Sequence, residues 1–325
     1  MLNNNYFRFT RFVFSLIICS LVLSACSSFQ AVSERTYPAV WQVHSENPNA
    51  GNIWLFGTIH ALPYGKGIAR FNGRSNYRRR FSYPTWLSPI ARNALRASDV
   101  ILLEIVEPST PRSNNTDVDI SGQTLLDNLD DASKQRIIAL AQARGFKHEE
   151  IDTLSAADLL VAFSLFSKQN RKLLDQPGVE NWLRVFARES RLQLNGLESS
   201  EDRITAITET FKQISSTDHE RVITEYFNIA LSETSNKEVD LQALYQRWIS
   251  GDSILTEKQS VALARDYPEI YAAFITYRNK LWIPRIQEYI NSGKNVFIAV
   301  GEAHLNGPDN VRELLETAGY KVQRL

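Results

Sequence analysis

Apolar and polar positions near the amino end predict a β-hairpin followed by a helix and a strand. The segment AVWQV (39–43) is joined to NIWLFGTIH (52–60) by SENPNAG, a turn rich in Asn with a Pro. Two short apolar runs around such a turn are typical of antiparallel strands. Residues 84–99 have apolar positions at helical spacing and predict a helix. The apolar run VILLEIV (100–106) predicts a buried strand, interrupted by one acid, Glu104.

The middle of the chain, from about 124 to 290, has a mainly helical pattern. It is broken at LQLNGLES (192–199), which predicts another strand, and it ends in a long helix over 269–293. KNVFIAVGEAHL (294–305) predicts a strand and a turn, and the last residues a helix and a final strand. The fold class is therefore α/β, with a mixed central sheet formed by the N- and C-terminal segments and a large helical middle region.

The first 25 residues have a pattern of their own. MLNNNYFRFTRF carries Arg8 and Arg11 but no acid, and the apolar run after it, VFSLIICSLVL, is too short for a spanning helix. A basic start, an apolar centre and small residues before a cleavage point are typical of a secretory signal peptide. We therefore interpret residues 1–25 as a signal peptide.

The motif LSAC resembles the bacterial lipobox and implies lipid attachment at Cys26, which would become the mature N-terminus. Residues 26–37 would then be a lipid-attached tether and residues 38–325 the folded domain. By resemblance to sorted lipoproteins, Ser27 after the cysteine implies the bacterial outer membrane, with the domain facing the periplasm. An uncleaved anchor and an ordinary signal peptide are the alternatives.

The composition of the chain limits the partners and the metal ligands that can be expected. The 36 basic and 36 acidic residues balance, so nothing favours a nucleic-acid partner. The stretch that contains Arg78–Arg80 is expected to be an exposed loop, with a phosphate or lipid patch as the alternative. The only cysteines are Cys19 and Cys26, so the mature domain would hold neither a free thiol nor a disulfide. A metal site would have to use His, carboxylate and water.

Two short motifs, FGTIHALP (56–63) and VGEAHLNG (300–307), share a Gly three residues before a His. Both follow an apolar run, so His60 and His304 come where predicted strands end. Ligands of α/β sheets bind outside the carboxyl ends of the strands. Strands from opposite ends of a chain can be neighbours in one sheet, which would bring the two histidines to one rim.

Carboxylates accompany these histidines. Glu104 is the natural third ligand, because a buried carboxylate is costly unless it is paired or bound to a metal. Glu302 and Glu198 are further acids near predicted strand ends. Taken singly, each of these residues can equally be a hydrogen-bonded structural residue, and spacing alone leaves both interpretations open. The remaining histidines are His44, His148 and His219, and no motif around them supplies a further ligand residue.

The segments WLFGTIH, ILLEI, YRNKLW and VFIAVGEAHLNGPDNVRELLETAGYKV together resemble the TraB/GumN family, to which the Tiki metalloproteases are related. The resemblance covers about residues 38–325. It extends to GVENWLRVFARESRLQLNGLES in the middle, where Glu180 stands in place of an expected Asp. It implies an α/β core of the EreA/ChaN-like kind. It also implies a divalent-metal site, whose ligands in this chain would be His60, His304 and Glu104.

The resemblance favours a metal-dependent hydrolase, with a peptide or protein as substrate. The ion would be Mn²⁺, Co²⁺ or Zn²⁺, and Glu302 or Glu198 would accept the proton of water. Arg278 and Asn279 match the family's YRN motif and would stabilise an oxyanion and orient substrate or a ligand; the alternative is a pair on the helix surface that anchors a carboxylate. One alternative is a lipoprotein that binds a metal, haem or a small ligand without turnover. Another is a regulator of conjugation or export through protein contacts.

Overall fold

The chain divides into two compact units, Met1–Thr36 and Tyr37–Leu325. The computed structural model describes residues 36–60, 62–63, 66, 70–72, 80–106, 131–143, 147–151, 178–213, 218, 221–222 and 241–325. The signal peptide and lipidated Cys26 lie outside these residues, so they and the domain boundaries stay predictions. No described helix is long and apolar enough to cross a membrane.

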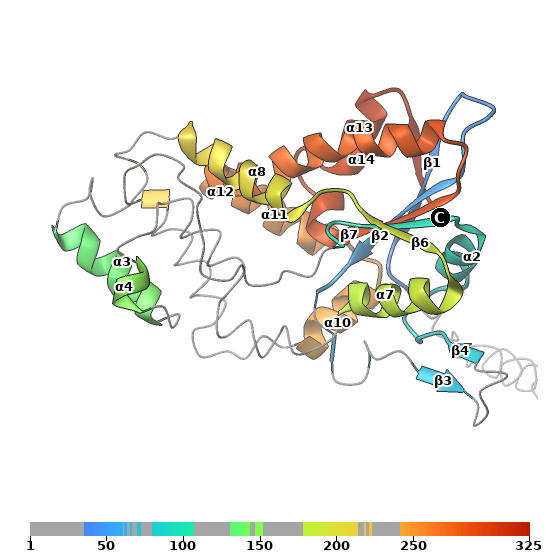
Figure 1. Cartoon of the computed structure of the whole chain (residues 1–325), viewed down its shortest axis with the longest axis horizontal. Coiled ribbons are helices and arrows are strands. Elements are labelled where there is room, and N and C mark those ends of the chain that lie inside the picture. Colours follow the sequence, from blue (N-terminus) through green and yellow to red (C-terminus); the bar gives the residue numbers. More distant parts are fainter. Residues whose placement is uncertain are drawn as a thin grey trace, which may run out of the picture. The chain divides into compact units, whose positions relative to one another are not determined.

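The second unit is built on a mixed six-stranded sheet, ordered β6-β5-β7-β2-β1-β8 (Figure 1). Its strands are β1 (Val40–His44), β2 (Ile53–Thr58), β5 (Val100–Leu103), β6 (Gln193–Gly196), β7 (Val296–Gly301) and β8 (Lys321–Arg324). The neighbours β6, β5, β7 and β2 are parallel, and β1 is antiparallel to β2 and β8. The predicted hairpin and the mixed sheet of N- and C-terminal segments are confirmed.

Both faces of the sheet are covered by helices, which is why the parallel strands β2, β5 and β7 are buried, mainly apolar runs. Side chains of β2 alternate, with Ile53 and Leu55 packed in one core and Trp54 and Phe56 in the other. The first core contains residues of α13 (Tyr277–Asn291) and α14 (Val311–Thr317). The second contains residues of α2 (Pro89–Ala97), α7 (Val179–Ser190) and α10 (Leu241–Ile249). Figure 1 shows α13 and α7 on opposite sides of the sheet.

Two predicted elements are shorter than expected. The helix expected over 84–99 begins only at Pro89, which suits a first turn because it needs no N–H there. The Ser88 side chain caps it by accepting a hydrogen bond from the Ala91 N–H at 2.9 Å. The strand expected over 100–106 ends at Leu103, so Glu104 follows the strand and does not interrupt it.

The long helix expected over 269–293 is composite. It consists of α12 (Pro268–Tyr271), a π-helical turn (Ala272–Thr276) and α13. Helix α13 ends shortly before Gly293, whose φ is 73°. The other described helices are α3 (Asp131–Ala143), α4 (His148–Ile151), α8 (Ser200–Lys212) and α11 (Ile254–Asp266). The middle region is therefore helical where it is described, with the predicted strand present as β6.

One expected loop is partly a strand. Residues Arg80–Ser82 form β4 and pair with β3 (Arg70–Asn72) in a separate two-stranded sheet. Backbone pairing replaces the exposed loop expected at Arg80, whereas Arg78 lies outside the described residues.

Candidate functional site

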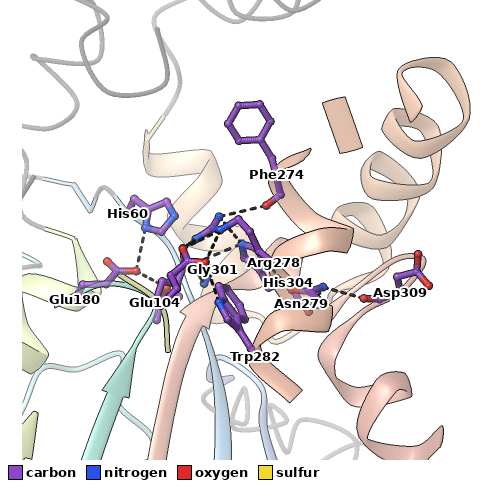
Figure 2. Close-up of polar contacts among 12 residues, drawn as sticks. His60, Glu104, Glu180, Phe274, Arg278, Asn279, Trp282, Gly301, His304 and Asp309 are labelled. Carbon is purple, nitrogen blue, oxygen red and sulfur yellow. Dashed lines mark hydrogen bonds and ion pairs between the residues drawn. The ribbon is translucent and has the colours of Figure 1, made fainter. Parts of the chain in front are cut away.

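Four neighbouring parallel strands end at one edge of the sheet. Thr58 at the end of β2 pairs with Gly301 at the end of β7, and Leu103 at the end of β5 pairs with Gly196 at the end of β6. Within three residues after these four ends lie His60, His304, Glu104 and Glu198. The sheet order thus brings together residues that are up to 244 positions apart in sequence, and Figure 2 shows His60, Glu104 and His304 around Arg278.

Arg278, on α13, joins the two carboxylates. Glu104 Oε2 accepts from Arg278 Nη2 at 2.8 Å, and Glu104 Oε1 accepts from the Gly301 N–H at 2.7 Å. Glu198 Oε1 accepts from Arg278 Nε at 2.8 Å and also from Nη2, and Glu198 Oε2 accepts from Trp282 Nε1 at 2.9 Å. The Glu198 side chain is fully buried, so these bonds replace the water that a carboxylate otherwise needs.

The remaining donors of Arg278 are also engaged. Its Nη1 lies 3.2 Å from the carbonyl oxygen of Phe274, in the π-helical turn, and 3.3 Å from His304 Nε2. A guanidinium has five N–H groups, and all five therefore have an acceptor here. Burial lowers the pKa of Arg278, but Glu104 and Glu198 outweigh it and raise that pKa above its ordinary value. Burial raises the pKa of Glu198, while Arg278 and Trp282 act in the opposite direction.

His304 is held in one tautomer. Its Nδ1 lies 2.6 Å from Asn279 Oδ1, while Asn279 Nδ2 donates to the Asp309 carbonyl at 2.9 Å. Because the amide oxygen faces the ring, Nδ1 carries the proton and Nε2 does not. Burial lowers the pKa of His304 to about 3, so the ring is neutral at neutral pH. The Nε2 lone pair faces Arg278 and lies 3.8 Å from Glu104 Oε1.

His60 stands at the open side of the cluster. Its side chain is 65% exposed, and its Nδ1 lies 3.0 Å from Glu180 Oε1, on α7. The Thr58 hydroxyl donates to the same oxygen. The Glu180 carboxylate raises the pKa of His60 to about 9, against the effect of burial. On the other side of the cluster, burial raises the pKa of Glu104, but His304, Arg278 and His60 together hold it below its usual range.

Gly301 leaves a space that three predicted ligands border. A Cβ at Gly301 would lie 3.1 Å from Glu104 Oε1, 3.3 Å from His60 Nε2 and 3.6 Å from His304 Cδ2. Two imidazole nitrogens and a carboxylate oxygen are a suitable donor set for Zn²⁺, Mn²⁺ or Co²⁺. Each ring also has a second partner at Nδ1, as metal-binding histidines usually do. These features fit a divalent ion.

The fit requires one rearrangement. Within the part of the chain that the structure describes, no three His, Cys, Asp or Glu side chains are arranged to hold an ion as they stand. Arg278 Nη1 occupies the bonding direction of His304 Nε2, so an ion bound there would have to displace this contact.

The model of the TraB/PrgY/gumN family matches residues 39–324. The chain belongs to the TraB/PrgY/gumN family. The matched region contains every element of the sheet and all the residues described at the site, which confirms the resemblance expected from the sequence. No curated protein and no solved structure matches the chain.

The structure brings six of the seven predicted metal-binding and catalytic residues into one network. The catalytic roles predicted for these residues stay predictions. These six are His60, Glu104, Glu198, Arg278, Asn279 and His304. Glu302 precedes His304 in the turn after β7, but its side chain hydrogen-bonds Thr256, on α11, and faces Arg247. Burial raises the pKa of Glu302.

The glycine before each histidine is expected to let a ligand or ion approach closely, and Gly301 does border this space. The sequence assigns no site role to Glu180, Thr58 or Trp282, which also contact the cluster. Signals for them are present, because Thr58 lies inside FGTIH and Trp282 inside YRNKLW. Glu180 was visible as the acid of the family's middle segment, but only the structure shows that this segment contacts His60.

Proposed function

We propose that the protein is a hydrolase that activates water at the edge formed by His60, Glu104 and His304, with a divalent metal ion as cofactor and a peptide bond as substrate. The observation that supports this most is that two imidazoles with tied Nδ1 atoms and one carboxylate border the same space above Gly301. When bound, the ion would polarise a substrate carbonyl and lower the pKa of water towards about 7.

The chain's own residues would admit the substrate and hold Glu104 and His304 in place. Substrate and water approach from the side of His60, because its side chain is 65% exposed while those of Glu104 and His304 are 15% and 5% exposed. Arg278 and Glu198 hold Glu104 in place, and Asn279 holds His304. With all five N–H groups engaged, Arg278 would have to release one to bind an oxyanion.

Proton transfer needs an acceptor that reaches the open side. Both oxygens of Glu198 are bonded to Arg278 or Trp282, and Glu302 hydrogen-bonds Thr256. The His60 side chain is 65% exposed, with its Nε2 bordering the space above Gly301 and its Nδ1 at the Glu180 carboxylate.

This geometry favours a second candidate, hydrolysis without an ion. The specific observation is the 3.3 Å contact between Arg278 Nη1 and His304 Nε2, which already gives that nitrogen a partner. In this case His60 Nε2 would take the proton from water when the ring is neutral, which a pKa of about 9 allows mainly at alkaline pH, and Glu180 would stabilise the imidazolium that forms.

The proposal retains the location expected from the sequence, with the domain tethered by a lipid on Cys26 at the outer membrane and facing the periplasm. Its support is the LSAC motif after a basic and apolar start. Labelled palmitate should enter the wild-type chain in bacteria and not a Cys26→Ser variant. Equal labelling of both would contradict lipid attachment at Cys26.

The deciding experiment measures metal content and cleavage with the full chain. Wild type, a His60→Ala/His304→Ala variant and a control His148→Ala variant, changed at an exposed residue of α4, are dialysed against Mn²⁺, Co²⁺ or Zn²⁺. We expect about one ion in wild type and control, none in the folded double variant, and peptide cleavage only with the ion.

Other outcomes separate the alternatives. Cleavage that persists in chelator and is lost in His60→Ala would support hydrolysis without an ion. Retention of a metal or small ligand without any cleavage would overturn hydrolysis and leave the binding function. No ion and no cleavage in folded wild type would overturn both candidates.

A further inference from the structure

Helix α7 contacts both the His60 segment and the segment after Glu104. At its start, the Val179 N–H donates to the Ile59 carbonyl at 3.3 Å. A Cβ at Gly178 would lie only 2.2 Å from the His60 carbonyl oxygen, so glycine is needed for this approach. One residue further, Glu180 Oε1 accepts from His60 Nδ1.

The next turn of the same helix holds the other segment. Arg184 Nη1 donates to the Val106 carbonyl at 2.5 Å, and Arg184 Nη2 donates to the Ile105 carbonyl at 2.5 Å. These two carbonyls directly follow Glu104. Two successive turns of α7 therefore tie together the backbone on both sides of the space above Gly301.

We propose that Glu180, fixed by the Thr58 hydroxyl, is a positioning residue that keeps the Nδ1–H of His60 toward α7 and its Nε2 toward Glu104. The positioning role rests on the proposed function in one respect, because His60 Nε2 is the atom that would bind the ion or accept the proton of water there. Nothing in the family match assigns a role to Glu180.

The tautomer of His60 follows from which groups can donate and which can accept a hydrogen bond. A neutral imidazole carries a single N–H, and a carboxylate can only accept. The ring must therefore place its proton on Nδ1 while it faces Glu180, which leaves Nε2 unprotonated. Thr58 donates to the same carboxylate oxygen and so limits its rotation.

His60 needs such a partner more than His304 does. The ring of His304 is 5% exposed and is confined by packing and by Asn279, whereas that of His60 is 65% exposed. Without Glu180, water could bond to either ring nitrogen of His60 and the ring could turn. Glu180 stands in the first turn of α7, where an anionic side chain is also favourable to the helix.

The test reads the tautomer directly. Full-length protein labelled with ¹⁵N-histidine is studied by NMR, using two-bond couplings within the imidazole at a pH where the ring is neutral. Among the five histidines, the His60 signals are assigned by their loss in His60→Ala. We compare wild type with Glu180→Ala and Glu180→Asp, and with Glu189→Ala as the control at the exposed end of the same helix.

We expect the Nδ1–H tautomer in wild type and in Glu189→Ala, a shift to Nε2–H in Glu180→Ala, and partial recovery in Glu180→Asp. Co²⁺ alone, followed by its visible absorption, should bind about 10–100-fold more weakly to Glu180→Ala than to the control. An Nε2–H tautomer in wild type would overturn the proposal without any variant, and so would an unchanged tautomer in folded Glu180→Ala.

The two proposals fail separately. The tautomer is observed without an ion, a substrate or turnover, so wild type that binds no Co²⁺ would contradict only the metal-dependent hydrolase. An Nε2–H tautomer in a chain that binds Co²⁺ and cleaves peptides would contradict only the positioning role of Glu180.

Discussion

Replacing Arg278 with Met removes the cation that joins two buried carboxylates, and we expect the free energy of unfolding to fall by about 3–5 kcal/mol. The Arg278 side chain is 7% exposed, and those of Glu104 and Glu198 are 15% and 0% exposed. In the variant, Glu104 keeps the Gly301 N–H, and Glu198 keeps only Trp282 Nε1. Because whole domains are stable by about 5–15 kcal/mol, such a loss is large.

The double variant Arg278→Met/Glu198→Gln should be less destabilised than Arg278→Met, because it also removes the charge that has been left uncompensated. Urea unfolding can be followed by tryptophan fluorescence, since the guanidinium lies 5.1 Å from the Trp282 ring centroid. The control is Arg265→Met, whose partner Asp266 lies at the exposed surface, and no measurable change is expected. Equal stability of Arg278→Met and Arg265→Met would refute the reasoning.

Two more predictions concern the same edge. Gly301→Ala should weaken Co²⁺ binding at least tenfold in a folded chain, because the new methyl would lie 3.1 Å from Glu104 Oε1 and 3.3 Å from His60 Nε2; unchanged affinity would show that this space is not used. As the pH falls from 6.5 to about 3, unfolded His304 takes up a proton that the folded ring, with a pKa of about 3, does not. His304 should therefore lower the free energy of unfolding of wild type by about 1.4 kcal/mol per pH unit over this range. Urea midpoints across this range should fall less steeply in His304→Asn, and an equal slope would contradict a neutral buried ring.

Much of the sheet could be predicted from the sequence because its central strands, β2, β5 and β7, are buried on both faces. Residues 53–58 and 296–301 are apolar or small throughout, a pattern that indicates covered parallel strands. The matched G-x-x-H motifs then placed His60 and His304 at strand ends. Their meeting at one edge followed from a general rule about α/β sheets and not from any local pattern.

The contacts around these residues could not be predicted in the same way. That Arg278 uses all five N–H groups depends on a π-helical turn that presents the Phe274 carbonyl, and helical periodicity does not distinguish such a turn from an α-helix. Directly after the end of β5, the Glu104 carboxylate accepts a hydrogen bond from the Gly301 N–H, almost 200 residues away. Such details are set by tertiary pairing, which overrides local preference.

The two matched motifs place their histidines in unlike surroundings. His304 is buried, neutral and held by an amide, Asn279, whereas His60 is exposed and held by a carboxylate, Glu180. An imidazole with an ionised partner tolerates a positive charge, while a buried ring with an amide partner does not. For the proposed hydrolysis, a change of charge is therefore expected at His60, with His304 as the fixed member of the pair. The similarity of FGTIH and VGEAH thus reflects a shared position at a strand end, and the difference in surroundings comes from what α7 and α13 place behind each ring.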